Sequence, residues 1–168
     1  LARFKDGRLE VWTHSQGIFG LRQELAMVLR MDEKNIVVTH AEGAGCYGHN
    51  GADDVALDAA LLARAANGRP VKLQWMREDE FAWEPYGIGM RVELEAHLDA
   101  AGSVVSWTHQ VWSNGHSHRP GRSQKPTLVA ATHLAEPFER ADAQNPALPA
   151  GGAHRNAIPL YEFPEQLI

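Results

Sequence analysis

The amino-acid sequence predicts an α+β fold with a mixed sheet, arranged as a single domain over 1–168. In the first half, strand-like and helix-like hydrophobic periods alternate in the order β-α-β-α-β. In the second half, two long alternating segments predict an antiparallel hairpin. Regularity then fades, so we expect a regular α+β core over 1–112 and a largely irregular C-terminal tail over 113–168.

The composition is that of a globular protein, with 44% hydrophobic and 22% charged residues. The net charge of −5 argues against a strongly basic nucleic-acid-binding surface. No apolar run reaches the roughly 18–20 residues that a membrane-spanning helix needs. Cys46 is the single cysteine, which excludes an internal disulfide and any multi-cysteine zinc or iron–sulfur site built by this chain alone.

The first predicted strand covers 8–13, where polar and apolar residues alternate. Apolar residues then recur at helical spacing: Ile18, Leu21, Leu25, Val28 and Leu29. This period predicts a helix over 16–30 with charged residues on its wet face. A polar turn at 32–35 separates the helix from a β-branched run, which predicts a buried strand over 36–39.

A glycine-rich loop over 42–51 leads into the second predicted helix, over 52–66. This helix is rich in alanine, so it can pack closely on a sheet. Asp53 and Asp54 fall in its first turn, where the helix dipole favours negative charge. The alternating pattern that follows predicts a third strand over 71–75.

The second half contains the clearest alternation in the chain, over 90–98, which predicts a strand with one dry and one wet face. A turn at 99–102 and a returning strand over 104–112 complete the hairpin. A short helix is expected over 130–140. The proline-rich stretch over 144–164 is expected to be irregular.

The segment Gly43 to Gly48 matches the dinucleotide-binding pattern G-x-G-x-x-G between a predicted strand and a predicted helix. Three features argue against that function. Residues 49–51 separate the motif from the helix, Asp53 and Asp54 would repel a phosphate, and no acidic residue follows about 20 residues later. A tight structural turn is the simpler interpretation, although such a loop also offers backbone N–H donors to an anion or oxo group.

The histidines raise the possibility of a zinc site. His116 and His118 would share one face of a strand, and His109 lies on the incoming strand. Because no carboxylate or cysteine falls at ligand spacing, solvated histidines are the favoured interpretation.

Cys46 has His40 and His49 nearby in the sequence, the composition of a thiol nucleophile with a base. A small buried thiol in a turn is the favoured interpretation. The acidic residues of 78–84 are likewise interpreted as solvated charges rather than as acid–base groups.

The run from Gly43 to Asp54 resembles the molybdenum-cofactor loop of the xanthine dehydrogenase/aldehyde oxidase family. It is most similar to the isoquinoline oxidoreductase/nicotinate dehydrogenase-like branch, among the large, molybdenum-cofactor-binding subunits. Segments similar to the same branch follow one another in the family's order: 12–16, 68–80, 113–120 and 155–164. The resemblance therefore covers nearly the whole chain.

The resemblance implies a role for five residues. Gln16 would hydrogen-bond an oxo ligand of molybdenum through its side-chain amide. Tyr47 and Gly48 stand where the family usually has Phe-Gly and would contact the metal's ligands through the backbone. Gly45 and Cys46 complete the expected cofactor-binding set, and no residue of the chain is expected to ligate the metal directly.

The chain departs from the commoner family pattern at two places. Cys46 is extra relative to the Gly-Gly-Gly-Phe-Gly form. Residues 49–51, His-Asn-Gly, replace the family's Gly-Lys-Glu, whose glutamate helps to place purine substrates. The second departure makes xanthine an unfavoured substrate.

The resemblance implies an oxidoreductase that hydroxylates a carbon of an N-heterocycle or an aldehyde, with oxygen taken from water. The implied cofactor is a molybdenum-pterin dinucleotide, expected as molybdopterin cytosine dinucleotide, and this chain would form one wall of its site. The family's general-base glutamate and a following arginine–glycine stretch lie outside the chain. We therefore expect the chain alone to be inactive and to purify without molybdenum.

The expected partners are the remainder of the molybdenum subunit, an iron–sulfur subunit or domain, and a small-molecule substrate. The sequence begins at Leu1 rather than at methionine, so it is expected to be one domain of a longer subunit. The compartment stays open between bacterial cytoplasm and periplasm. The alternatives are a non-catalytic α+β module with a purely structural glycine loop and a dinucleotide-binding domain.

Overall fold

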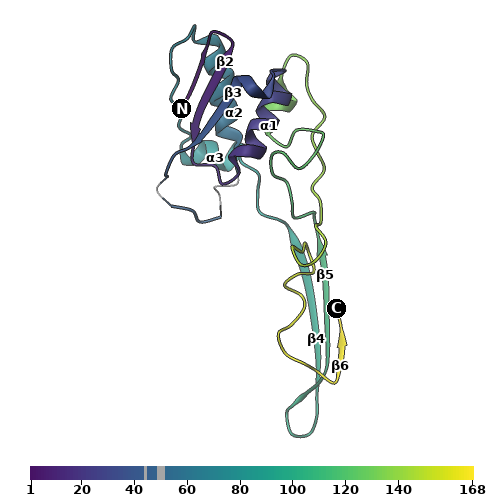
Figure 1. Cartoon of the computed structure of the whole chain (residues 1–168). Helices are drawn as coiled ribbons and strands as arrows, with labels where there is room; N and C mark the ends of the chain where they lie inside the picture. The colour runs from purple at the N-terminus through teal and green to yellow at the C-terminus, as the bar shows by residue number, and fades with distance from the viewer. Residues whose placement is uncertain (44, 49–51) are drawn as a thin grey trace. The chain divides into compact units, whose positions relative to one another are not determined.

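The computed structural model of the chain describes residues 1–43, 45–48 and 52–168. The chain divides into two compact units, and each is described by itself (Figure 1). The first unit contains Leu1–Pro85 and Arg119–Ala141, and the second contains Tyr86–His118 and Asp142–Ile168. That both units form a single domain stays a prediction.

A three-stranded mixed sheet forms the centre of the first unit. Its strands are β1 (Ala2–Lys5), β2 (Arg8–Thr13) and β3 (Ile36–His40), in that order. β1 pairs antiparallel with β2 through a turn at Asp6 and Gly7, both of which have positive φ, and β2 pairs parallel with β3. The predicted strands at β2 and β3 are confirmed, whereas β1 is too short for its period to be recognised in the sequence. The prediction that 36–39 is buried is wrong, because only Ile36 is buried in β3.

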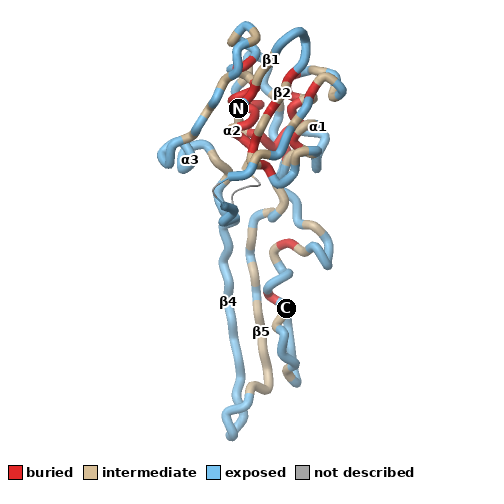
Figure 2. The backbone as a smooth tube through the Cα atoms, turned by 60° about the vertical axis from the view of Figure 1, so that its left-hand side comes forward, coloured by how far each residue is buried: buried red, intermediate tan, exposed pale blue. Residues whose placement is uncertain are grey.

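Two helices cover this sheet. α1 (Ile18–Leu29) packs on β3, and α2 (Asp54–Ala65) packs on β1 and β2. Both predicted helices are confirmed, and each is shorter than its predicted range, 16–30 or 52–66. Their buried faces and the sheet form the core of the unit, drawn red in Figure 2. Small side chains bring α2 close to the sheet: Ala56, Ala59, Ala60 and Ala63 are all buried.

The strand predicted over 71–75 does not form. Only Val71 pairs, in an isolated antiparallel bridge with Ala2. The indole N–H of Trp75 donates to the carboxylate of Asp58 on α2, at 3.2 Å, so this end of the segment is held by a helix rather than by the sheet. The first half of the chain therefore follows the order β-β-α-β-α.

A third helix, which the sequence pattern did not reveal, follows that segment. α3 (Arg77–Trp83) begins where the carboxylate of Asp79 accepts the backbone N–H of Met76, at 2.9 Å. The acidic residues at its start lie in the first helical turn, and none of its residues is buried.

The prediction of a short helix over 130–140 is also wrong. Only a short 3₁₀ helix, η2 (Val129–His133), is present. The backbone N–H groups of residues 127–129 donate to the carboxylates of Glu24 on α1 and Asp54 on α2. Side chains of other helices thus satisfy this stretch of backbone, which no sequence period can indicate.

The second unit is built on the predicted hairpin, which is confirmed. The dry face predicted for its first strand is wrong, because every residue of 90–98 is exposed. β4 (Met90–Leu98) and β5 (Val104–Ser113) are antiparallel, and Asp99 closes the turn by accepting the N–H groups of Ala101 and Ser103. β6 (Glu165–Leu167) adds to β5 in parallel, so this sheet is mixed as well. β6 falls within the segment that was expected to be irregular.

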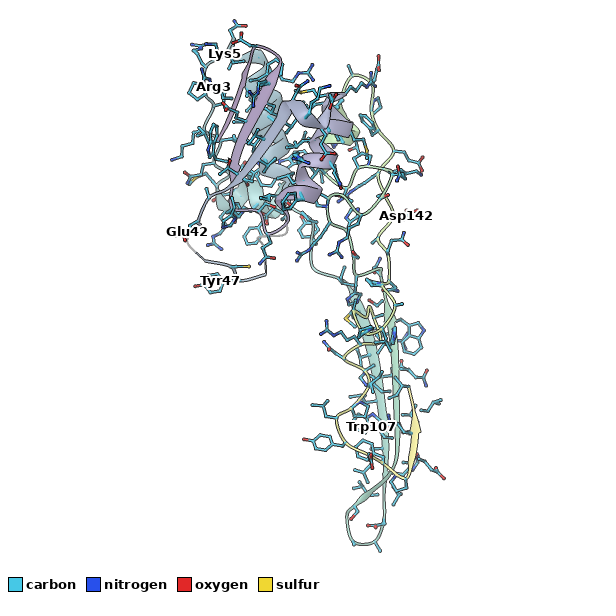
Figure 3. All side chains as sticks on the ribbon, viewed as in Figure 1. Arg3, Lys5, Glu42, Tyr47, Trp107 and Asp142 are labelled. Atoms are coloured by element: carbon cyan, nitrogen blue, oxygen red, sulfur yellow. The ribbon has the colours of Figure 1, made fainter. Side chains whose placement is uncertain are left out.

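The C-terminal segment covers one face of β5. Trp107 stacks on Phe163 with ring centroids 5.5 Å apart, and the Nδ1 atom of His109 lies 2.9 Å from the carbonyl oxygen of Ala157. Figure 3 labels Trp107 on this strand. The fold class is α+β, as predicted, and none of the helices within the described residues has the length and apolar character that crossing a membrane requires.

Candidate functional site

Gln16 lies at the carboxyl end of β2, in the short connection to α1. Its neighbours fix the backbone there. The carbonyl of Ser15 lies 3.1 Å from Nδ1 of His40, and the hydroxyl of Ser15 accepts the N–H of Gly17 at 3.0 Å. Because β2 and β3 are parallel, Gln16 and the loop that follows β3 meet at the same edge of the sheet.

The side-chain amide of Gln16 has a partner at each end. Its Nε2 atom donates to Sγ of Cys46 at 3.1 Å, and its Oε1 atom accepts from Nη1 of Arg119 at 3.4 Å. The structure therefore brings together two of the predicted site residues, Gln16 and Cys46. It adds Arg119, which comes from a segment far along the chain.

The described part of the glycine loop needs glycine for its backbone. Gly45 and Gly48 have φ of 141° and 102°, values that residues with a side chain rarely adopt. A Cβ on Gly45 would lie 3.0 Å from the ring of Tyr47, whereas a Cβ on Gly48 would meet nothing within 4 Å. The backbone at Gly48 is thus open to an incoming group.

Tyr47 points away from the protein. Its side chain is 94% exposed, and Figure 3 shows it at the same end of the first unit as Glu42. Four loop positions from the sequence analysis, Ala44 and residues 49–51, lie outside the described residues.

Two buried polar groups near Gln16 were not identified as site residues from the sequence. Asp53 is 4% exposed and Ser15 is 2% exposed, and their side chains hydrogen-bond to each other. Burial raises the pKa of the Asp53 carboxyl, while the Ser15 hydrogen bond and the charges of His14 and Arg119 oppose that rise. Asp53 occupies the N-cap position of α2, but its side chain makes no capping hydrogen bond. The helix dipole therefore does not fully account for Asp53, because its side chain also makes tertiary contacts.

A depression of about 300 Å³ opens beside the Gln16 amide. Its lining residues come from α1, the start of α2 and the segment after the second unit's hairpin: Gln16, Gly17, Gly20, Gln23, Asp53, Arg119, Pro120, Gly121 and Arg122. Two arginines, one aspartate and two glutamines therefore line one small volume.

Two glycines seat the Arg119 segment against α1. A Cβ on Gly20 would lie 2.4 Å from the carbonyl oxygen of Pro120, and a Cβ on Gly121 would lie 2.4 Å from Cα of Gly20. These distances leave no room for a side chain at either position. The close backbone contact fixes the place of Arg119, which the sequence analysis did not single out.

The variant Gly20→Ala is expected to lower the free energy of unfolding by about 1–3 kcal/mol, because its Cβ overlaps Pro120. Gly17→Ala is the matched control, since a Cβ on Gly17 meets nothing within 4 Å. Urea denaturation of both variants gives the comparison. An equal or smaller loss in Gly20→Ala than in Gly17→Ala would show that the contact is not tight.

The other groups considered from the sequence do not assemble into sites. Within the residues that the structure describes, no cluster of three or more histidine, cysteine, aspartate or glutamate side chains has the geometry of a metal site. His109 pairs with Ala157 and His116 lies 3.0 Å from the Ser113 hydroxyl. For the thiol hypothesis, Nδ1 of His40 is engaged by Ser15, and His49 lies outside the described residues. The favoured interpretation of Cys46 as a buried thiol is wrong, because Cys46 is exposed.

Comparison with known proteins gives two matches. Residues 1–144 match the family model described as molybdopterin cofactor-binding domain. The chain is 40% identical over 166 residues to a nicotinate dehydrogenase subunit of Pseudomonas putida, in a match that covers 97% of this chain and 12% of that protein. The chain thus spans 12% of the length of this curated relative.

Proposed function

Because the chain belongs to the molybdopterin cofactor-binding domain family, we propose that it forms one wall of the molybdenum-pterin site of a molybdenum hydroxylase. The enzyme would be an oxidoreductase that hydroxylates a carbon of an N-heterocycle or an aldehyde with oxygen from water. The observation that supports this proposal is the Gln16 amide, whose donor atom Nε2 contacts Cys46 of the glycine loop.

The chemistry of the residues at this edge fits an anionic, oxygen-bearing group. Nε2 of Gln16 is a hydrogen-bond donor, and the backbone around Gly48 is open to approach. Loops with glycine at positive φ present backbone N–H groups to such ligands. The donor set therefore fits the oxygen ligands of the cofactor, and no side chain of the loop is required to bind the metal itself.

In this proposal each site residue has a distinct task. Gln16 donates a hydrogen bond to a ligand atom of the cofactor, and Gly45, Cys46, Tyr47 and Gly48 shape the loop that lies over it. When bound, the cofactor accepts the electrons that leave the substrate carbon. The exposed ring of Tyr47 takes no part, so phenylalanine is expected to serve equally well at this position.

We infer an N-heterocyclic substrate, with nicotinate as the first compound to test, since the relative is named a nicotinate dehydrogenase. The cofactor form proposed is molybdopterin cytosine dinucleotide. The proposed partners are the remainder of the molybdenum subunit and an iron–sulfur subunit or domain that carries electrons away. With Cys46 as its single cysteine, this chain has no multi-cysteine ligand set for such a cluster.

Gln16→Leu in the subunit that carries this chain is expected to lower turnover of the heterocyclic substrate by about 100-fold, the size of effect seen when one aligned donor is removed. Molybdenum content, pterin content and turnover are measured together. Gln110→Leu, an exposed glutamine on β5, is the control and should behave like the wild type. Full turnover in Gln16→Leu would contradict the proposed function.

The isolated 168-residue chain provides a separate measurement. We expect it to purify without molybdenum, because the other walls of the site belong to the remainder of the subunit. Stoichiometric molybdenum in elemental analysis of this chain would contradict the proposal that it forms one wall alone.

A further inference from the structure

We propose that Arg119 is a positioning residue that fixes the side-chain amide of Gln16, so that the donor atom Nε2 faces the glycine loop. The inference rests on the proposed function, because the fixed donor is the atom that would meet the cofactor's ligand. It assigns a task to a residue that the sequence analysis placed in a family-like segment but not in the site.

The first step is the chemistry of the amide. A glutamine amide has an acceptor end, Oε1, and a donor end, Nε2, of nearly the same shape. If the amide of Gln16 were turned by half a rotation, Oε1 rather than Nε2 would face the loop. Something must therefore distinguish the two ends if Gln16 is to offer a donor.

Arg119 makes that distinction. A guanidinium group has only donors, so it can bond Oε1 but not Nε2. Its Nη1 atom lies 3.4 Å from Oε1 of Gln16, while Nε2 of the same amide lies 3.1 Å from Sγ of Cys46. The arginine thus selects the orientation in which the donor faces the loop.

Asp53 attracts the guanidinium electrostatically. This carboxyl is 4% exposed, hydrogen-bonds with the Ser15 side chain, and interacts electrostatically with Arg119. The other charged groups around Asp53 are His14, which acts in the same direction as Arg119, and Glu24, which acts against it. A carboxylate attracts the guanidinium, so it helps to keep the donor group of Arg119 near the Gln16 amide.

The backbone also places Arg119. The contact of Gly20 with Pro120 and Gly121, too close for any Cβ, presses the residues after Arg119 onto α1. Gln16 directly precedes the first turn of the same helix. The contact therefore fixes both partners of the Arg119–Gln16 hydrogen bond to one rigid element.

The test is nuclear magnetic resonance on the ¹⁵N-labelled 168-residue chain of 18.5 kDa. The side-chain amide signal of Gln16 is assigned by its loss in Gln16→Leu. Arg119→Ala is expected to raise the hydrogen-exchange rate of this amide about fivefold and to lower its heteronuclear Overhauser effect. Arg119→Lys, which keeps a donor, should restore part of the wild-type behaviour.

Two internal controls separate positioning from general damage. The backbone amides of Thr127 and Leu128, held by Glu24, report whether the Arg119 segment stays in place. Arg69→Ala removes an arginine of the same unit that bonds the carbonyl of Ala66, and it should leave the Gln16 amide unchanged. A changed Gln16 amide with unchanged Thr127 and Leu128 amides supports the proposal.

Unchanged exchange of the Gln16 amide in Arg119→Ala would overturn the positioning role, whatever the molybdenum content of the subunit. Full turnover in Gln16→Leu would instead overturn the proposed function, whatever the amide does. In the subunit, Arg119→Ala is further expected to lower kcat more than it raises KM, because the arginine acts through Gln16 and not on the substrate.

Discussion

Glu24→Ala is expected to lower the free energy of unfolding by about 3–5 kcal/mol. Glu24 is 1% exposed, and its carboxylate accepts hydrogen bonds from the backbone N–H groups of Thr127 and Leu128 and from the Thr127 hydroxyl. Alanine would leave two backbone donors buried without an acceptor. It would also release the segment that carries Arg119, so the candidate site depends on this carboxylate.

Urea denaturation of the chain measures this loss. Glu24→Gln keeps an acceptor oxygen in the same place and is expected to lose about half as much. Glu33→Ala is the control, because Glu33 pairs with Arg22 at the surface and such pairs contribute about 0–1 kcal/mol. Similar losses in Glu24→Ala and Glu33→Ala would show that Glu24 does not hold the segment.

Asp54→Asn is expected to stabilise the protein at pH 7.5 by up to about 3 kcal/mol. Asp54 is 4% exposed, and burial raises the pKa of its carboxyl from 3.8 to about 6. The folded state therefore binds a proton more tightly than the unfolded state does. The contribution of Asp54 to stability falls as the pH rises from about 4 through about 6, where the buried group becomes charged.

Asparagine removes this loss and keeps the oxygen that accepts the N–H of Val129, at 2.7 Å in the wild type. Thermal unfolding at several pH values should show the two proteins converging near pH 4 and Asp54→Asn above the wild type at pH 7.5. The stability of Asp54→Asn should itself still fall as the pH rises, because burial also raises the pKa of Asp53 and Asp58.

Asp54→Ala separates the charge from the hydrogen bond. It lacks both the charge and the acceptor, so it should be less stable than Asp54→Asn at every pH, by about 1–3 kcal/mol. The raised pKa of Asp54 predicts that the stability difference between Asp54→Asn and the wild type is larger at pH 7.5 than at pH 4.5. An equal difference at the two pH values would contradict it.

The elements that the sequence predicted correctly are those with a long, regular hydrophobic period. α1 and α2 each have one buried face, and the residues on that face repeat at helical spacing. β4 and β5 have a regular alternation of polar and apolar residues, and they form the predicted hairpin although every residue of β4 is exposed. The strand expected over 71–75 shows the limit of this reasoning. Its alternation is real, but a helix holds Trp75 through Asp58, and a residue pattern does not say which neighbour a segment pairs with.

The candidate site divides in the same way. Gln16 and the loop residues Gly45 to Gly48 were identified by their resemblance to family motifs, and their assignment to the cofactor stays a proposal. The literal G-x-G-x-x-G match does not begin a helix, since α2 starts only at Asp54. The chain belongs to the molybdopterin cofactor-binding domain family instead.

The sequence by itself determined the α+β class, the main helices and hairpin, and the family. These depend on local periodicity and on motifs that lie within a few neighbouring residues. Only the tertiary structure decided that Asp53 and Gln16 line the same depression and that Arg119 bonds the amide oxygen of Gln16. The reason is physical: these contacts join side chains from separate segments, and close backbone packing at Gly20 and the buried carboxylate of Glu24 bring those segments together.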